Sequence, residues 1–534
     1  MRLLSLFCLW LAFSQDSLLA QEQIIGQADE WVLTRSASKT SWKNILASVR
    51  ELEIVETFGP REKYALVRAK RKLTQKLPRE IIALQRNYIY KSVELQDPDF
   101  IQSWGLSNSG QIIPELGQGI SGVDVGALKT WQIESGSKKV SVAVLDTGID
   151  MHHEDLKNNL WTNYLEVKEN SLDDDHNGFV NDIHGWNFVN DTSIIQDDNN
   201  HGSAVSGVIG ADAKNGKGTR GLAENISLMT VKILDANGSG TTERAVRGIE
   251  YAVKNGAAVI NASWGGTLYD QVLFDTIKWA NEQGVLVVCA AGNEGKNNDI
   301  DEQPIYPASF KIPNILSVAA HDFKGELAPF SNFGKQTVHV SAPGVGVFSS
   351  VRGGYQFMNG TSFAAPFVAA MSALLKWREP ELKPEQISKR ISSTTIPMHY
   401  YVQQKLLSGG RVHSFNALKN ISSFKPETPI DWKRTSKSIE SLHPYTNNTQ
   451  TVFEIKQPGA THIRVHFVKM DLEKQYDYLR IKDEEGRLVM SYSGKSDAFW
   501  SADVLGSVMR IELVSDFSNA QWGFAIDAIE TTDK

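Results

Sequence analysis

Apolar runs of strand length alternate with helical stretches between about residues 97 and 420, and this alternation constrains the fold most. A strand that is apolar along its whole length is buried on both faces, as in a parallel sheet covered by helices on both sides. We therefore predict an α/β domain built on a parallel sheet. The predicted strands are 140–145, 226–234, 257–263 and 285–290, and the predicted helices are 243–254, 268–283 and 361–378.

The segments that flank this domain have different patterns, and a chain of 534 residues has room for several domains. Residues 30–95 follow the order strand, helix, strand, strand, helix, strand, which predicts a small α+β (ferredoxin-like) unit. Its second helix is predicted at 74–85 and its last strand at 88–95. A polar stretch with two prolines, 421–440, is predicted to be a linker. From residue 441 apolar and polar residues alternate, which predicts an all-β sandwich.

The first twenty residues have the pattern of a signal peptide. Arg2 precedes an apolar run at 3–13, and Ala20 precedes a cleavage point before Gln21. The run is too short to cross a bilayer, although an uncleaved anchor is the alternative. Removal of this segment would leave Cys289 as the single cysteine, so the mature chain would contain no internal disulfide.

The net charge of −7 provides no basic surface for nucleic acid.

Three segments contain the residue types of nucleophilic catalysis. Asp146 ends the apolar run 140–145, His201 begins a predicted helix, and Ser362 lies where a long apolar helix begins. Each has a simpler interpretation: a structural carboxylate, a surface or capping histidine, and a helix-capping serine. Together they offer a nucleophile, a general base and a carboxylate that orients the base. Asn293, after the strand at 285–290, is either an oxyanion donor or a turn residue.

The order Asp, His, Ser and the residues around them resemble the subtilisin-like serine proteases (subtilases, peptidase S8 type). The resemblance covers roughly residues 97–420 and implies a serine-type endopeptidase that hydrolyses proteins through an acyl-enzyme on Ser362. It implies that His201 is the general base, that Asp146 orients it, and that Asn293 and the Ser362 N–H bind the oxyanion. The matching motifs are 104–106, 146–148, 201–202, 292–293, 360–362, 364–366 and 408–411.

The resemblance also implies a cleft that binds an extended peptide between two edge segments, with a third segment near the scissile residue. Turn formation is the alternative for the glycines of these segments. Trp264 is bulkier than the leucine common in the family, and Phe363 and Phe367 replace its usual Met and His, so an unusual cleft is expected. The implied substrate-binding residues are Gly238, Ser239, Gly240, Ser263, Trp264, Gly265, Ala290, Ala291 and Gly292.

The N-terminal unit, residues 21–95, resembles the inhibitor-type propeptide of subtilases. Such a segment assists folding, inhibits the enzyme, and is removed by the enzyme's own active site. A separate binding domain is the alternative.

An acidic insert between the predicted catalytic Asp and His resembles the start of a calcium loop. Asp173, Asp175 and Asn177 occupy its first, third and fifth positions. His184 stands where a bidentate glutamate is expected, and Asp182 is a substitute. A solvated acidic loop is the alternative.

The C-terminal segment 441–534 resembles a CUB domain in its motifs at 471–473, 476–479, 515–518 and 523–524. The resemblance implies Glu473, Asp477 and Asp516 as calcium ligands and a protein or glycan as binding partner. Exposed loop carboxylates are the alternative.

We therefore expect a secreted, self-processing serine endopeptidase located outside the cell, on its surface or in the periplasm. Structural calcium is expected, and a redox or nucleotide cofactor is not. Two alternatives remain open: a catalytically silent adhesin that acts through its CUB-like domain, and a surface-assembly protein that cleaves only its own propeptide.

Overall fold

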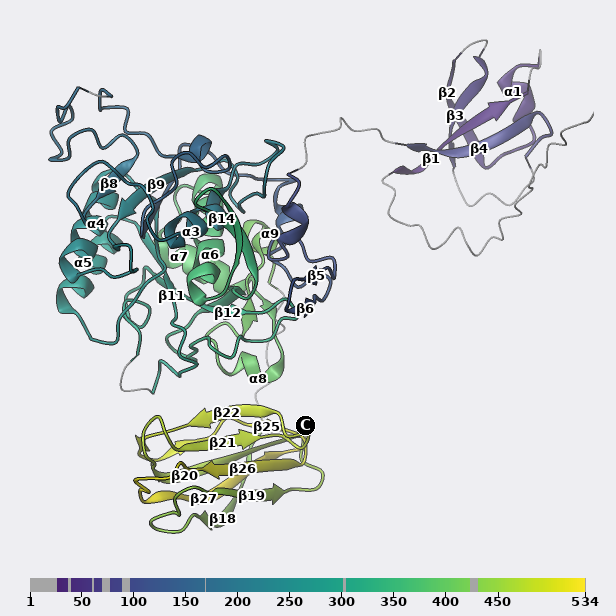
Figure 1. Ribbon diagram of the computed structural model, residues 1–534. Helices are drawn as coiled ribbons and strands as arrows, with labels where there is room; N and C mark the ends of the chain where they lie inside the picture. The colour runs from purple at the N-terminus through teal and green to yellow at the C-terminus, as the bar shows by residue number, and fades with distance from the viewer. Residues whose placement is uncertain are drawn as a thin grey trace, which may run out of the picture. The chain divides into compact units, whose positions relative to one another are not determined.

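The computed structural model describes residues 26–36, 40–59, 62–69, 77–88, 97–168, 170–300, 304–422 and 431–533. The chain divides into two compact units, Met1–Glu94 and Leu95–Lys534 (Figure 1). The predicted signal peptide, and the predicted strand 88–95 beyond Tyr88, lie outside the described residues. Among those described, no helix has both the length and the apolar character needed to cross a membrane.

The N-terminal unit is a four-stranded antiparallel sheet in the order β2-β3-β1-β4. Leu33 and Val67 of the sheet pack against Trp42 of a short helix. The helix predicted at 74–85 is wrong from residue 81 onward, because that stretch pairs with β1 and obtains its backbone hydrogen bonds there. Tertiary pairing overrides local preference at such an edge strand. The elements are β1 (Gly26–Arg35), α1 (Trp42–Ile45), β2 (Leu52–Phe58), β3 (Tyr64–Ala69) and β4 (Ile81–Tyr88).

The second unit begins with the predicted α/β domain, whose nine-stranded sheet has the order β16-β17-β13-β12-β11-β10-β7-β9-β8. Neighbouring strands are parallel except for β16 and β17. The strands are β7 (Ser141–Asp146), β8 (Gly185–Asn187), β9 (Ser227–Lys232), β10 (Val259–Ala262), β11 (Leu286–Ala290), β12 (Ile315–His321), β13 (Val340–Pro343), β16 (Ile396–Pro397) and β17 (Gly410–Arg411).

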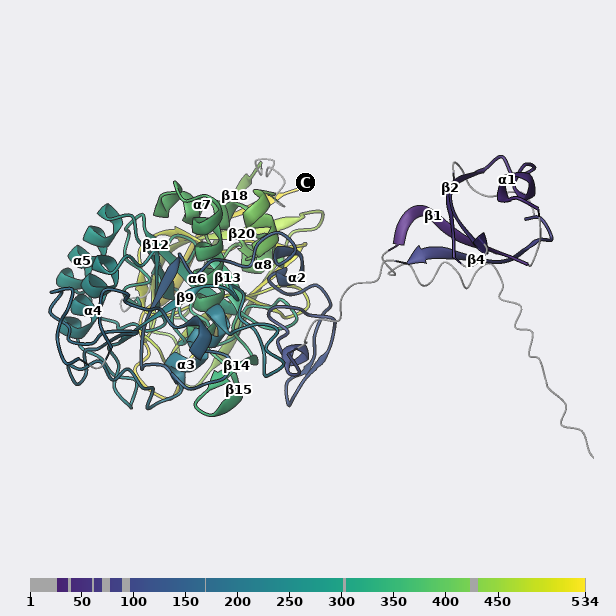
Figure 2. The same ribbon diagram turned by 90° about the horizontal axis from the view of Figure 1, so that it is seen from above.

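Successive side chains of the central strands enter opposite apolar cores, as a strand buried on both faces requires. Val142 and Val144 pack in the core around helices α3 (His201–Gly210) and α6 (Thr361–Arg378). Ala143 and Leu145 pack in the core around α4 (Thr242–Lys254) and α5 (Gln271–Glu282). The last two helices lie side by side in both views (Figures 1 and 2). The predicted parallel sheet with helices on both faces is confirmed.

The remaining elements of this domain lie around the sheet. They are the 3₁₀ helices Phe100–Gln102 and Lys157–Asn159, α2 (Ala127–Thr130), α7 (Pro384–Ser393), α8 (Tyr400–Gln403), α9 (Ser414–Lys419), and the hairpins β5 (Ile112–Ile113) with β6 (Gly117–Gln118) and β14 (Val347–Val351) with β15 (Gly354–Met358).

The predicted β-sandwich at the C-terminal end is confirmed, and no residue from 431 to 533 is helical. One sheet has the order β18-β27-β20-β23, with β24 and β25 also paired to β20, and the other has the order β19-β26-β21-β22. The linker predicted at 421–440 is too long, because residues 433–440 form a strand that pairs with β27. The strands are β18 (Lys433–Glu440), β19 (Gln450–Lys456), β20 (His462–Asp471), β21 (Tyr478–Lys482), β22 (Leu488–Tyr492), β23 (Lys495–Ser496), β24 (Phe499–Trp500), β25 (Val504–Leu505), β26 (Val508–Val514) and β27 (Gly523–Thr532).

Candidate active site

The loops after four adjacent strands, β9, β7, β10 and β11, leave the same edge of the central sheet, because these strands are parallel neighbours. Ligands and catalytic groups gather at the carboxyl ends of parallel strands. Asp146 ends β7, and the segments 238–240, 263–265 and 290–293 follow or end β9, β10 and β11 in turn. The fold thus brings the predicted catalytic carboxylate and the predicted peptide-binding segments to one edge.

A short hydrogen bond joins the predicted base to the predicted carboxylate. His201 Nδ1 lies 2.7 Å from Asp146 Oδ1, and Asp146 is fully buried. The same carboxylate oxygen accepts the Thr147 N–H at 2.7 Å. With its Nδ1 proton donated to Asp146, the neutral ring presents Nε2 as an acceptor, which is the tautomer that a general base requires.

The position of His201 at the start of α3 depends on a buried carboxylate that the sequence analysis missed. Asp197 accepts hydrogen bonds from the Thr147 hydroxyl and from the N–H and hydroxyl of Ser203, at 2.6–2.9 Å. These bonds tie the first turn of α3 to the loop after β7. Gly202 makes this approach possible, because a methyl group there would lie 2.2 Å from the Gly148 carbonyl oxygen. The sequence did contain a signal that could have identified Asp197: it belongs to a run of Asp and Asn residues just before a helix start, where such residues often cap the helix.

The electrostatics around His201 favour its charged form. Burial disfavours that form, but the charge and hydrogen bond of Asp146, aided by the charge of Asp197, outweigh burial and raise the pKa of His201 above its ordinary value. Asp197 is also buried, yet its hydrogen bonds from Ser203 and from the N–H groups of Asn199 and Asn200 lower its pKa. A raised histidine pKa suits a group that must accept a proton and then release it.

Ser362 is the second residue of α6, where the sharp entry into the helix uses Gly360 at φ +143°. Its hydroxyl donates to the Ser263 carbonyl at 3.0 Å, and the Ser263 hydroxyl donates to the Ser362 carbonyl at 2.7 Å. The Ser362 carbonyl oxygen is free to accept the Ser263 hydroxyl because Pro366, four residues later, has no N–H to donate to it. The Phe363 ring lies 5.2 Å from the His201 ring between centroids, so the start of α6 and the start of α3 are in contact.

The amide of Asn293 is oriented by the same helix start. Its Oδ1 accepts hydrogen bonds from the N–H and the hydroxyl of Thr361, both at 2.9 Å. The side-chain NH₂ therefore lies on the side away from Thr361, and the residue is exposed. The Ser362 N–H belongs to the first helical turn, where N–H groups lack partners within the helix. These two donors have the chemistry of an oxyanion hole.

The predicted peptide-binding segments differ in their exposure. Residues 238–240 are exposed, and the Ser239 N–H and carbonyl are held by Asp235. Gly265 is exposed as well, whereas Trp264 packs against the core around α4 and α5, with its indole Nε1 buried. Trp264 is only partly buried, and its place in the peptide-binding segment stays a prediction. Cys289 is fully buried, and burial raises the pKa of its thiol, as expected for a structural residue.

In the acidic insert, Asp173 and Asp175 come together with Glu166, and one oxygen of each lies within 4.8 Å of the others. Sequence reasoning missed Glu166, which precedes the loop and carries no motif. Asn177 lies against the same carboxylates, because its backbone N–H donates to Asp173 and Asp175 and its side-chain amide donates to Asp175 and Asp182, and its role as a ligand stays a prediction. Three converging carboxylates form a donor set suited to a hard cation such as Ca²⁺.

The three carboxylates predicted in the C-terminal sandwich also converge. Glu473, Asp477 and Asp516 each place an oxygen within 4.8 Å of the others. Asp477 is fully buried, and Glu473 Oε2 is buried without a hydrogen-bond partner among the described residues. A buried carboxylate oxygen without a partner is costly unless a cation neutralises it. This cluster therefore fits Ca²⁺ better than the cluster at Glu166 does.

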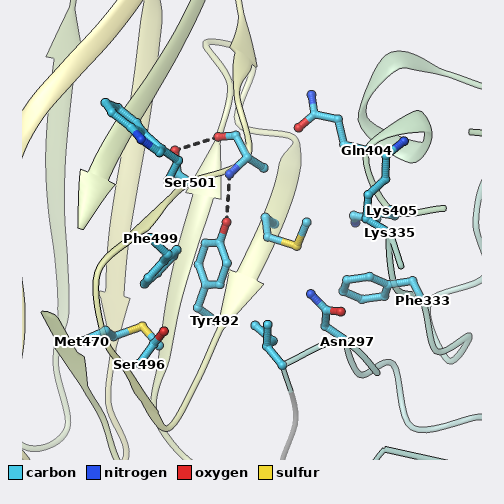
Figure 3. A pocket seen from close by; sticks show the side chains of 14 residues that line it. Asn297, Phe333, Lys335, Gln404, Lys405, Met470, Tyr492, Ser496, Phe499 and Ser501 are labelled. Atoms are coloured by element: carbon cyan, nitrogen blue, oxygen red, sulfur yellow. Dashed lines mark hydrogen bonds between the residues drawn. The ribbon is translucent and has the colours of Figure 1, made fainter. Parts of the chain in front are cut away.

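A cavity of about 320 Å³ lies where the central domain meets the sandwich (Figure 3). Phe333 and Lys405 line it from one side, and Tyr492 and Phe499 line it from the other. Its lining includes none of the triad residues, so it is separate from the candidate active site.

The comparisons with known proteins agree with this geometry. The model of the subtilase family matches residues 137–423, and the model of the CUB domain matches residues 430–527.

Individual relatives share about a third of the matched positions. A thermophilic serine proteinase of Bacillus sp. (strain AK1) is 35% identical over 294 residues, which are 54% of this chain and 64% of that protein, so the chain spans less than two thirds of this relative. The major intracellular serine protease of Bacillus subtilis (strain 168) is 35% identical over 297 residues, 54% of this chain and 84% of that protein. A solved protease structure from Pseudoalteromonas arctica PAMC 21717 aligns with a TM-score of 0.49 at 26% identity, covering 61% of this chain and 99% of that chain.

Proposed function

Because the chain belongs to the subtilase family, we propose that it is a serine endopeptidase that hydrolyses peptide bonds of proteins through an acyl-enzyme on Ser362. The observation that carries this proposal is the hydrogen bond of 2.7 Å between His201 and Asp146, on the sheet edge where the Ser362 helix begins. The tautomer set by this bond leaves a basic nitrogen available for a serine proton.

In the proposed reaction, Ser362 Oγ attacks the scissile carbonyl carbon while His201 Nε2 takes the hydroxyl proton. To do so, the hydroxyl leaves the Ser263 carbonyl, to which it donates in the free enzyme. The tetrahedral oxyanion accepts hydrogen bonds from Asn293 Nδ2 and the Ser362 N–H. His201 then donates its proton to the leaving amine, and water repeats the sequence on the acyl-enzyme.

The proposal includes export and self-processing. The signal-peptide pattern at 1–20 supports secretion to the cell exterior, the cell surface or the periplasm. The strand order of the N-terminal unit, β2-β3-β1-β4 with all pairs antiparallel, supports its assignment as an inhibitor-type propeptide of residues 21–95, which the active site removes.

Structural calcium is also part of the proposal. Glu473, Asp477 and Asp516 would hold one ion, and Glu166, Asp173 and Asp175 would hold another. A bound cation would neutralise carboxylates that otherwise repel one another, and would thereby stabilise the loops that carry them. No redox or nucleotide cofactor is part of the proposed reaction.

The CUB domain is proposed to bind a protein or glycan and to hold the protease near its substrate. Tyr476 and Phe517 support this role. Both are largely exposed and adjoin the carboxylate cluster in sequence, and exposed aromatic side chains are common at binding surfaces.

The test is proteolysis of an unrelated, unfolded protein such as reduced and alkylated casein, with Ser362→Ala as control. The proposal predicts fragments with the wild type only, together with loss of the N-terminal unit from the wild type only. If the wild type removes its own N-terminal unit but leaves casein intact, it cleaves only itself. If both proteins stay intact, the proposed activity is wrong.

A further inference from the structure

The central domain and the sandwich are joined by a shared apolar cluster and by hydrogen bonds around α8. Phe333 of the central domain belongs to the same buried cluster as Tyr492 of the sandwich. The Tyr401 hydroxyl donates to Asp483 at 3.2 Å, and the side-chain amide of Gln404 exchanges hydrogen bonds of 3.3 and 3.2 Å with the Asp503 backbone. The cavity of about 320 Å³ beside these contacts therefore has walls that are held in place.

The walls of this cavity are aromatic and sulfur-containing. Phe333 faces Tyr492 and Phe499 across it, and the last two rings lie 5.1 Å apart between centroids (Figure 3). Met470 and Met490 complete the apolar lining on the side of the sandwich and are 2% and 7% exposed. Methionine sulfur makes favourable contacts with aromatic rings. A lining of this kind favours a ligand with an aromatic body.

The side chain of Lys405 brings a positive charge to the cavity. Its Nζ lies 5.1 Å from the centroid of the Phe333 ring. Burial lowers the pKa of Lys405 to about 8, and no carboxylate among the described residues opposes that shift. The other lysine of the lining, Lys335, donates to the carbonyls of Gln403 and Leu406 at 2.9 and 3.0 Å. An ammonium partly removed from water is stabilised by an anion beside it, so Lys405 favours an anionic ligand.

The cavity extends to the protein surface, which gives a ligand a way in. Ile300 and Lys335 belong to its lining and are both exposed. Small-molecule sites are commonly found where two domains meet, and they combine mostly apolar walls with a few polar groups. Their volumes are roughly 300–1,000 Å³, so a cavity at the lower end of this range suits a ligand with a single ring.

We propose that the cavity binds a small carboxylate with one aromatic ring. Its anionic group pairs with Lys405, and its ring lies among Phe333, Tyr492 and Phe499. A ligand in this place contacts both domains and thereby stabilises the joint between them. The proposal does not depend on the proposed proteolysis, because the lining includes none of the triad residues.

The experiment is isothermal titration calorimetry of the full chain with phenylbutyrate. The chain carries Ser362→Ala, so self-digestion cannot disturb the measurement and the result is independent of the proposed function. We expect one phenylbutyrate per chain. Phenylbutyramide has the same body without the charge and should bind at least about 10-fold more weakly, because a charge-assisted hydrogen bond is lost. No saturable binding of phenylbutyrate, or equal affinity for the amide, would overturn the inference.

A matched pair of variants in the same background tests the lysine itself. Lys405→Met keeps an apolar side chain of similar length and should weaken phenylbutyrate binding at least about 10-fold. Lys324→Met is the control, because Lys324 also lies over a phenylalanine ring, 5.7 Å from the Phe323 centroid, but is exposed and outside the cavity. Equal affinities in the two variants would overturn the role of Lys405. If Lys405→Met does not fold, the comparison of phenylbutyrate with phenylbutyramide decides the question.

Discussion

Ser263 and Ser362 exchange hydrogen bonds: the Ser263 hydroxyl donates to the Ser362 carbonyl at 2.7 Å, and the Ser362 hydroxyl donates to the Ser263 carbonyl at 3.0 Å. The pair joins the end of β10 to the start of α6. It also replaces the helical hydrogen bond that Pro366 cannot make. The nucleophile is thus held at the sheet edge before substrate binds.

Ser263→Ala should lower the free energy of unfolding by about 1 kcal/mol, because the Ser362 carbonyl then loses its donor. Pro366→Ala restores an N–H four residues later, so the same loss should be smaller in that background. Denaturant unfolding of the two single variants and the double variant measures this coupling. Strict additivity of the single effects would contradict the account of Pro366.

Asn293→Asp should reduce kcat by about 10²-fold or more, because it removes the oxyanion donor while keeping an oxygen that can accept from Thr361. Asn293→Leu should reduce kcat comparably and should also lower the melting temperature, since it loses both hydrogen bonds to Thr361. Steady-state kinetics and thermal melts separate the two effects. A wild-type kcat in Asn293→Asp would remove Asn293 from the oxyanion hole.

Activity should fall as the pH decreases through the raised pKa of His201, because only the neutral ring can accept the serine proton. The acid limb of kcat/KM should therefore have its midpoint above 6.5, the ordinary value for histidine. Asp197→Asn removes a charge that favours the protonated ring and should move this midpoint to lower pH. A midpoint that stays in place in the variant would show that Asp197 acts only through structure.

Excess chelator should lower the melting temperature of the wild type, since an ion at one hundred times its dissociation constant stabilises by about 2.7 kcal/mol. In Glu473→Gln the chelator should have a smaller effect, because one carboxylate of the buried cluster is lost. Glu484→Gln, at an exposed position in the same sandwich, is the control. Equal chelator effects in the two variants would exclude a calcium site at Glu473.

The sequence predicted those parts of the fold whose signals are local. The apolar run that ends at Asp146 and the long apolar helix from Thr361 were both found at nearly their observed bounds. The first residues of strand β4 were predicted as part of a helix. Their conformation is decided by pairing with β1, about fifty residues earlier, and a short window of sequence does not show such pairing. The early start of the sandwich at β18 was missed for the same reason.

In the candidate site, too, the residues that could be predicted are those with a local sequence signal. His201 and Ser362 could be predicted as catalytic residues because each lies in a short motif at a helix start. Glu166 was missed because it belongs to no motif, and only the folded chain shows that its carboxylate converges with those of Asp173 and Asp175.

The most direct test of the central claim is labelling of mature protein with a serine-directed phosphonate, read by intact mass and peptide mapping. The account predicts one adduct per chain, located on Ser362, in the wild type, and none in Ser362→Ala. Equal labelling of the two proteins, or no labelling of a folded wild type, would contradict it.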